Sequence, residues 1–218
     1  DNGKTARLFG DRQTFVTGKG RLKIKSRNMY IDSEVVDMRP NGQGLFIVDG
    51  NRYEGELRSG VPNGFGKEIA HDGQVTEGKW KNGRPHGKAT MHTPDQGVYK
   101  GTLNGNYQPN GRGRWEVNDE YGSILEGHFK DGFLWGKGSL RNKLGYCVES
   151  EFSKGRVVPT AESKVTYPDG SIFIGQTNED GRHVRGSLYL AGSDEYVYDG
   201  EWKDGYKWKI EYKNKDGL

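Results

Sequence analysis

The chain has 218 residues, a mean hydropathy of -0.94 and only 31% hydrophobic residues, so it lacks the material for a thick apolar core. Its 11% aromatic content and nearly balanced charges argue against disorder, and its net charge of +3 gives no sign of a nucleic-acid binder. No apolar run approaches the roughly 20 residues of a membrane span. A single cysteine, Cys147, excludes an intrachain disulfide and favours a reducing, cytoplasmic compartment.

Read in chain order, a five-residue pattern with a central glycine recurs along the sequence. It is clear at residues 53–57, 76–80, 99–103, 125–129 and 198–202, with Gly55, Gly78, Gly101, Gly127 and Gly200 as anchors. Extending the spacing adds Gly10, Asp32, Ser150 and Gly175, so that nine units tile the chain at steps of 22 to 26 residues. Two units, near residues 28–45 and 146–165, are degenerate because another residue replaces the anchor glycine.

Each unit has the features of a β-hairpin. Asn-Gly and Asp-Gly pairs, as at residues 82–83 and 131–132, supply the positive φ angles of a tight turn. A Gly-x-Gly motif such as Gly64 to Gly66, or a relic of it, follows about nine or ten residues after the anchor. The spacing therefore predicts two strands and a turn in every unit.

This arrangement resembles the MORN repeat, in which an aromatic-x-Gly-x-aromatic segment precedes a turn and a Gly-x-Gly segment. The resemblance covers nearly the whole chain and is clearest over residues 53–138 and 173–205. It implies an all-β fold, an elongated single-layer antiparallel sheet of about nine stacked hairpins that forms one array over residues 1–218. It also implies binding of protein partners, with lipid binding proposed for such arrays as well.

Side-chain alternation predicts two different faces of the sheet. Tyr53, Gly55 and Leu57 point to one side, whereas Glu54 and Glu56 point to the other. The first face would be a trough with a glycine floor that holds an extended or helical partner segment. The predicted partner-binding residues are Tyr53, Trp80, Tyr99, Leu103, Trp115, Phe129 and Trp202. The alternative is that these rings lie over their own glycines and fill the trough.

Basic residues on the opposite face allow two interpretations. Lys19, Lys88, Arg112 and Lys137 stand between the paired glycines, where they form a ladder for anionic ligands or take part in cross-strand ion pairs; the ion pairs are favoured. Five basic residues near the N-terminus alternate with apolar ones: Lys19, Arg21, Lys23, Lys25 and Arg27. They are the candidate patch for anionic phospholipid, or they protect a sheet edge from aggregation.

Enzymatic chemistry has little support in the sequence. His86 and His92 lie six residues apart on a strand, roughly 20 Å, too far to share a metal ion. His71, His128 and His183 are expected at surface or turn positions. The prediction is therefore a non-enzymatic protein-interaction scaffold without catalytic residues, metal or cofactor, cytoplasmic and peripheral to membrane or cytoskeleton. The alternatives are an adaptor for anionic membrane lipid, a regulatory segment of a larger enzyme and, more remotely, a carbohydrate module; the oligomeric state stays open.

Overall fold

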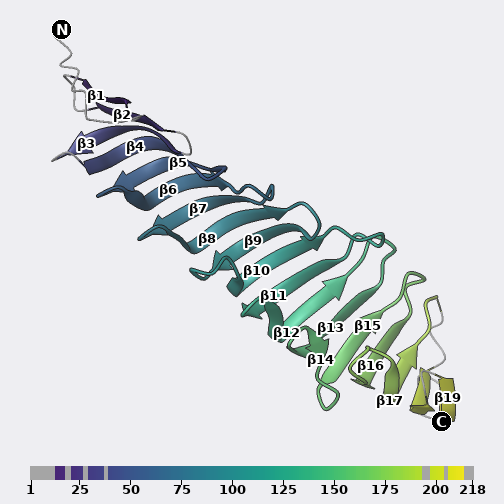
Figure 1. Cartoon of the computed structure of the whole chain (residues 1–218). Helices are drawn as coiled ribbons and strands as arrows, with labels where there is room; N and C mark the ends of the chain where they lie inside the picture. The colour runs from purple at the N-terminus through teal and green to yellow at the C-terminus, as the bar shows by residue number, and fades with distance from the viewer. Residues whose placement is uncertain are drawn as a thin grey trace. The chain divides into compact units, whose positions relative to one another are not determined.

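The computed structural model of the chain describes residues 13–17, 21–26, 29–36, 39–192, 197–203 and 206–213. These residues form strands and turns, and no helix is found among them. The chain divides into two compact units, residues 1–108 and 109–218, and in each unit the strands follow one another in chain order (Figure 1). The predicted all-β class of stacked antiparallel hairpins is confirmed.

In the described part of unit 1, each strand is antiparallel to the next. The strands are β1 (Gln13–Thr17), β2 (Arg21–Ser26), β3 (Met29–Val36), β4 (Arg39–Val48), β5 (Asn51–Arg58), β6 (Val61–Ile69), β7 (Val75–Lys81), β8 (Arg84–Thr93) and β9 (Gly97–Leu103). In the β5–β6 and β7–β8 hairpins the register shifts after the anchors Gly55 and Gly78. A β-bulge, which the repeat pattern did not predict, therefore follows the anchor in both hairpins.

The described strands of unit 2 are likewise antiparallel, with one interruption. They are β10 (Pro109–Val117), β11 (Ile124–Lys130), β12 (Phe133–Arg141), β13 (Cys147–Ser153), β14 (Arg156–Val157), β15 (Glu162–Thr166), β16 (Ile172–Thr177), β17 (His183–Tyr189), β18 (Val197–Lys203) and β19 (Tyr206–Lys213). Strand β13 pairs with β15 in its first half and with β14 in its second half. This interruption lies in the repeat near residues 146–165, which the sequence predicts to be degenerate.

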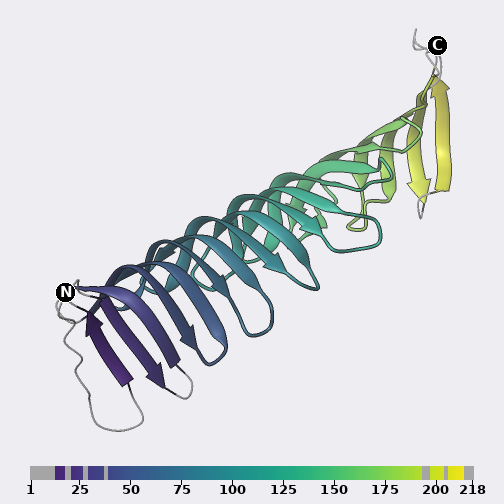
Figure 2. The same cartoon turned by 90° about the horizontal axis from the view of Figure 1, so that it is seen from above.

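The tight turns adopt the geometry that their sequences predict. Asn82 and Gly83 have φ angles of 52° and 78°, and Asp131 and Gly132 have φ angles of 50° and 89°. Two successive positive values are typical of the type I′ turn, which matches the twist of the flanking strands. Figure 2 shows the turns at the ends of the strands in both units.

The turns also tie each hairpin to the one before it. In unit 1 the amide of Gly83 donates a hydrogen bond to the carbonyl of Pro62 at 2.9 Å. In unit 2 the amide of Gly155 donates to the carbonyl of Leu134 at 3.0 Å. We call these contacts, with their counterparts from Gly60 to Pro40 and from Gly132 to Pro109, the turn-to-strand hydrogen bonds. They satisfy backbone groups that the strand ladders leave open.

Burial follows the predicted alternation and separates two faces. Tyr53 and Leu57 in β5 are buried, whereas Glu54, which stands between Tyr53 and the anchor Gly55, is exposed. We call the side that carries the buried rings the ring face and the opposite side the charged face. The apolar core of each unit is thus one layer of side chains on the ring face, packed against the backbone of its own sheet.

Candidate interaction surfaces

The ring face of unit 1 is filled by aromatic side chains that pack on one another. Tyr53 and Trp80 meet edge to face with ring centroids 5.2 Å apart, and Tyr107 packs on Trp80 at 6.1 Å. The Trp80 indole Nε1 donates to the carbonyl of Gly66 at 3.0 Å, and the Tyr53 hydroxyl donates to the carbonyl of Glu56. Edge-to-face pairs with satisfied polar groups are stabilising arrangements for buried rings.

Glu68 is a charged residue on the ring face of unit 1, directly opposite Tyr53, and Tyr107 supplies its polar partner. The Glu68 carboxylate accepts a hydrogen bond from the Tyr107 hydroxyl. Burial, and to a smaller extent this contact, raise the pKa of Tyr107. Tyr107 belongs to the turn after β9, where its φ angle is 59°. A loop ring thus covers the ring face and meets its polar partner there, which the sequence pattern did not reveal.

Glycine is required under these rings because they occupy the space of a side chain. A Cβ built on Gly66 would overlap the ring and hydroxyl of Tyr53. At the paired anchor Gly55, φ is 155° and a Cβ would meet the Tyr53 hydroxyl oxygen at 2.9 Å. Glycine alone combines that backbone angle with so close a contact.

The ring face of unit 2 contains a half-buried histidine. His183 stacks on Phe173 with ring centroids 3.6 Å apart and an interplanar angle of 11°, and Trp202 meets both rings edge to face at 5.3 Å. The His183 Nε2 is hydrogen-bonded to the Tyr167 hydroxyl. Burial lowers the pKa of His183 to about 4. The expectation that His183 lies at the surface or in a turn is therefore wrong.

The residues predicted to bind a partner lie together on the ring faces, with most of their area used inside the chain. In unit 1, Tyr53, Trp80, Tyr99 and Leu103 are buried to 5% exposure or less, and in unit 2 Phe129 and Trp202 are buried as well. Trp115 is half-buried, with its ring centroid 6.4 Å from that of Phe129. The filled trough, in which rings lie over their own glycines, matches these positions. Partner binding by these residues stays a prediction.

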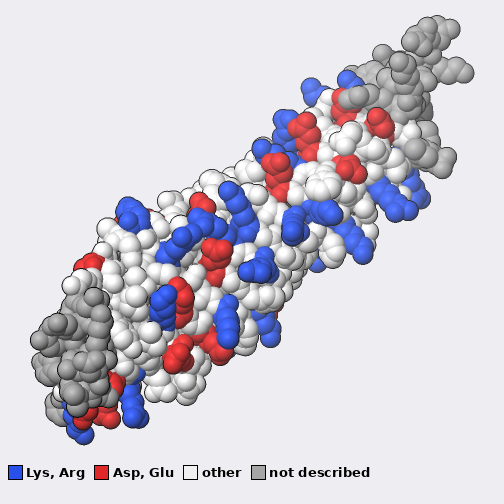
Figure 3. Space-filling view, turned by 180° about the vertical axis from the view of Figure 1, so that it is seen from behind, with Lys and Arg blue, Asp and Glu red and all other residues white. Residues whose placement is uncertain are grey.

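On the charged face, two rows of side chains flank the row of anchor glycines. Row one lies on the side of Lys67, and row two lies on the other side, where Phe65 and Arg112 stand between paired glycines. In unit 1, row one holds Glu54, Lys67 and Glu77, which lie directly opposite one another across β5, β6 and β7. Lys67 pairs with Glu77 at 3.9 Å, and in unit 2 Lys164 of row one pairs with Glu149 at 3.7 Å. These cross-strand ion pairs involve lysines beside the glycine row, whereas Lys88, Arg112 and Lys137 between the paired glycines form no ion pair within the described residues. The ion pairs predicted for these three are therefore not found, and Lys19 lies outside the described residues. Basic and acidic side chains are interspersed in the view of Figure 3.

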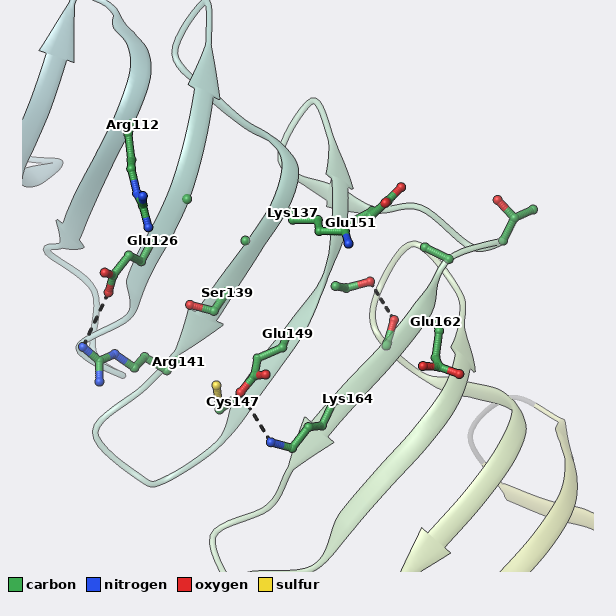
Figure 4. Close-up of a pocket in the computed structure, with 16 residues that line it drawn as sticks. Arg112, Glu126, Lys137, Ser139, Arg141, Cys147, Glu149, Glu151, Glu162 and Lys164 are labelled. Atoms are coloured by element: carbon green, nitrogen blue, oxygen red, sulfur yellow. Dashed lines mark hydrogen bonds and ion pairs between the residues drawn. The ribbon is translucent and has the colours of Figure 1, made fainter.

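Between the two rows of unit 2 lies a channel whose floor is the glycine row (Figure 4). Its volume is about 950 Å³, and Gly127, Gly138, Ser150 and Ser163 form its floor. Row one contributes Glu126, Ser139, Glu149 and Lys164; row two contributes Arg112, Lys137, Glu151 and Glu162. Thr160 and Ala161, from the segment between β14 and β15, add to the wall. The irregular repeat near residues 146–165 therefore contributes part of the channel wall.

Two of the channel's floor residues carry hydroxyls where regular units have glycines. The Ser150 and Ser163 hydroxyls are 2.7 Å apart, and the Ser163 hydroxyl lies 3.2 Å from that of Thr177. All three side chains are buried. The hydroxyls satisfy one another, so these small polar groups can replace glycine without leaving an unpaired buried hydroxyl.

The walls of this channel contain charged side chains that form no ion pair with any residue that the structure describes. Glu126 pairs with Arg114 and Arg141, and Glu149 pairs with Lys164. The row-two residues Arg112, Lys137, Glu151 and Glu162 form no ion pair within the described part of the chain and are exposed. The channel thus presents two cations from β10 and β12 and two anions from β13 and β15, and of these Lys137 and Glu151 lie directly opposite one another in the sheet.

A second hollow, of about 740 Å³, occupies the corresponding place in unit 1. Its floor includes Gly55, Gly66 and Gly78, and Phe65 of row two stands at its wall. Phe65 is 58% exposed and also borders a smaller hollow of about 420 Å³ toward the end of the β7–β8 hairpin. The charged face of unit 1 therefore exposes one large apolar side chain beside two hollows.

The basic run near the N-terminus is described only in part. Lys23 and Lys25 are exposed, and Lys23 pairs with Asp32 at 3.3 Å. Lys19 and Arg27 lie outside the described residues, as does the side chain of Arg21. The function of this run in lipid binding stays a prediction.

Neither a metal site nor a membrane-spanning helix is present in the described ranges. No group of three His, Cys, Asp or Glu side chains there is placed to hold a metal ion. None of the described residues belongs to a helix of the length and hydropathy that crossing a membrane requires. Cys147 lines the unit 2 channel, where burial and the nearby Glu149 raise the pKa of its thiol. A raised pKa disfavours the reactive thiolate.

Comparison with known proteins agrees with the repeat pattern. The MORN repeat family matches residues 53–75, 77–98, 126–142 and 198–208. Alsin from Rattus norvegicus is 25% identical over 193 residues, which are 83% of this chain and 11% of that protein. Alsin from Homo sapiens is 24% identical over 176 residues, 77% of this chain and 10% of that protein. The chain thus spans about a tenth of the length of these curated relatives.

Proposed function

Since this chain is built of MORN repeats, which are non-catalytic interaction modules, we propose that it is a protein-interaction scaffold. Its task is to hold a segment of a partner protein along the sheet, in the cytoplasm and peripheral to a membrane or the cytoskeleton. The single cysteine supports the reducing compartment. The observation that carries the proposal is the unit 2 channel, whose four row-two charges form no ion pair in the described ranges of the chain.

The channel suits a polypeptide better than a small ligand. Its charged residues come from β10, β12, β13 and β15, so a partner must cross several strands, which are spaced by about 4.8 Å. Such a partner meets Arg112 and Lys137 first, then Glu151 and Glu162. A segment with acidic residues followed by basic residues complements this order, and complementary charges favour the correct partner and register.

The ring face offers a second place for the same partner protein. Trp115 keeps part of its surface open, unlike the other predicted partner-binding rings, and exposed tryptophans commonly dominate interface energy. A partner that covers Trp115 would extend the apolar layer of unit 2. This proposal keeps the predicted groove but centres it on Trp115, which alone among the seven predicted partner-binding residues is half-exposed.

Pull-down of the full chain from native lysate, with quantitative mass spectrometry, tests the scaffold function and locates its surface. The variant R112E/K137E reverses the two row-two cations of the channel, W115A removes the half-open ring, and K143E/K154E is a control with the same charge change in exposed turns. We expect R112E/K137E to weaken the partner's affinity by at least about ten-fold and the control to leave it unchanged. Loss in W115A alone would move the interface to the ring face. Absence of any specific partner would refute the scaffold.

A regulatory segment of a longer protein is the second candidate function. The matched relatives are about ten times longer than the aligned region, which favours a segment that works next to further domains. The two functions are compatible, because the channel would then bind a segment of its own protein. Addition of the purified chain to the remainder of such a protein, with measurement of binding, distinguishes an internal from an external partner.

A further inference from the structure

Phe65 occupies a position that the repeat otherwise gives to polar residues. It is the middle residue of Gly64 to Gly66, and the corresponding residues of other units are Gln43, Lys88, Arg112 and Lys137. All five side chains are exposed on the charged face. The repeats act as internal controls here: since a polar residue folds equally well at this position, packing within the sheet does not account for a phenylalanine.

The backbone holds Phe65 firmly in this exposed position. Its amide donates a hydrogen bond to the Glu56 carboxylate at 3.1 Å, and Gly64, with a φ angle of 116°, forms the bulge beside it. The Lys79 ammonium lies 5.4 Å from the ring centroid, a cation–π contact. A partner therefore meets a preformed aromatic surface and loses little entropy in ordering it.

The surroundings of Phe65 are basic on the side of the smaller hollow. Arg58, Lys79, Lys81 and His86 line this hollow together with Phe65, and none of its described lining residues is acidic. The acidic residues of the neighbouring larger hollow are already engaged, Glu54 with Arg52 at 3.0 Å and Glu77 with Lys67. The Glu56 carboxylate beside the ring is engaged by the Phe65 amide, and Arg58, Lys79 and Lys81 form no ion pair among the residues described. An exposed ring is thus combined with cations that are available to a partner.

From this combination we infer that the charged face of unit 1 binds an acidic peptide segment that places an apolar side chain against Phe65. The hollow beside the ring admits one projecting side chain, which an extended peptide supplies, whereas a flat membrane surface would touch only the rims. Carboxylates on either side of that side chain reach Arg58, Lys79 and Lys81. The inference rests on the scaffold function but uses a different surface from the unit 2 channel.

Fluorescence anisotropy with three labelled synthetic peptides tests this inference on the full chain. The first peptide has the sequence Glu-Asp-Glu-Phe-Asp-Glu, the second has Ala in place of Phe, and the third has Lys in place of every acidic residue. We expect only the first to bind, with an affinity that falls as salt rises from about 50 to about 300 mM. Equal binding of the first two peptides would overturn the requirement for an apolar anchor.

Two variants and a matched control connect binding to the site. F65Q installs the residue found at position 43 and should weaken binding of the first peptide by at least about ten-fold, as should K79E/K81E. F133Q removes a ring of unit 2 that is 55% exposed and should change the affinity less than about two-fold. Because Phe65 is exposed, F65Q should melt like the wild type, and thermal melting confirms that the variant is folded.

Two outcomes separate this inference from its alternatives. Binding of vesicles of phosphatidylserine and phosphatidylcholine that depends on Phe65, without peptide binding, would overturn it in favour of a membrane surface. Peptide binding that F65Q leaves intact would place the site elsewhere and overturn it as well. If R112E/K137E loses the captured partner but binds the peptide normally, the two surfaces are independent, and failure of one does not decide the other.

Discussion

The two units contain nearly the same aromatic pair in different chemical surroundings. Tyr53 and Trp80 in unit 1 meet at 5.2 Å and 79°, and Phe173 and Trp202 in unit 2 meet at 5.3 Å and 87°. In each pair the first ring stands two residues before an anchor glycine and the second stands two residues after the next regular anchor. The repeat therefore fixes the geometry of the pair, and the residues around it can vary.

What varies is the polar group beside the pair. In unit 1 the Tyr53 hydroxyl reaches a backbone carbonyl, and burial raises the pKa of Tyr53 to about 12, with a smaller contribution from Glu56. In unit 2, Phe173 has no hydroxyl, and His183 and Tyr167 fill the space with a hydrogen-bonded pair. The ring cluster of unit 2 thus contains an imidazole, whose pKa burial lowers to about 4, in the place that the Tyr53 hydroxyl fills in unit 1.

Breaking the contact between ring and glycine should have the largest effect. We expect G66A to lower the free energy of unfolding by about 2 to 3 kcal/mol, because the added methyl group overlaps the Tyr53 ring. Urea unfolding measures the change. In a Y53A background the same substitution should cost clearly less, since the ring is gone. An equal cost in both backgrounds would show that the backbone and not the ring requires the glycine.

The hydroxyl chain of unit 2 tests whether polar groups replace glycine as inferred. S163A removes the central member and should cost about 1 to 2 kcal/mol, because the Ser150 and Thr177 hydroxyls lose a buried partner. The triple variant S150A/S163A/T177A should cost less than the sum of the three single variants, again by urea unfolding. Additive costs would contradict a connected chain.

The smallest effect should be the pH response of unit 2. The pKa of His183 is lowered from 6.5 to about 4, so the unfolded chain binds an extra proton between these values. The contribution of His183 is present above pH 6.5 and is lost as the pH falls toward 4. From pH 7 to pH 5 the melting temperature should drop by about 2 to 4 °C more in the wild type than in H183F. Equal drops would assign the pH response to other groups.

Much of the fold follows from local sequence, because the hairpins are made of short-range signals. Turn pairs such as Asn82 and Gly83 fix positive φ angles, and strict alternation places Tyr53 and Leu57 opposite Glu54. These signals predicted the hairpins, the two faces and the irregular unit near residues 146–165. These signals act within a single repeat, which is why composition and spacing were enough to predict the hairpins and the two faces.

The filling of the ring face depends on contacts between units, which a local pattern cannot reveal. Tyr107 reaches Glu68 from a loop 39 positions further along the chain, and His183 enters the Phe173 stack from the next strand. The β-bulges change which residues face each other after the anchor. The sequence therefore predicted a partner-binding site on the ring face. It also contained a signal for Phe65, which is the only aromatic residue between paired glycines.

The turn-to-strand hydrogen bonds have a consequence for how such a chain can grow. The β5–β6 hairpin contains both the glycine amide that donates to the preceding hairpin and the carbonyl that accepts from the next one, in Gly60 and Pro62, and the β11–β12 hairpin contains both in Gly132 and Leu134. Duplication of a whole unit of about 23 residues preserves every donor and acceptor. Insertion of one residue in a strand would instead exchange the two faces. Evolution can therefore lengthen the sheet in whole repeats, and each new repeat brings its own exposed position between paired glycines.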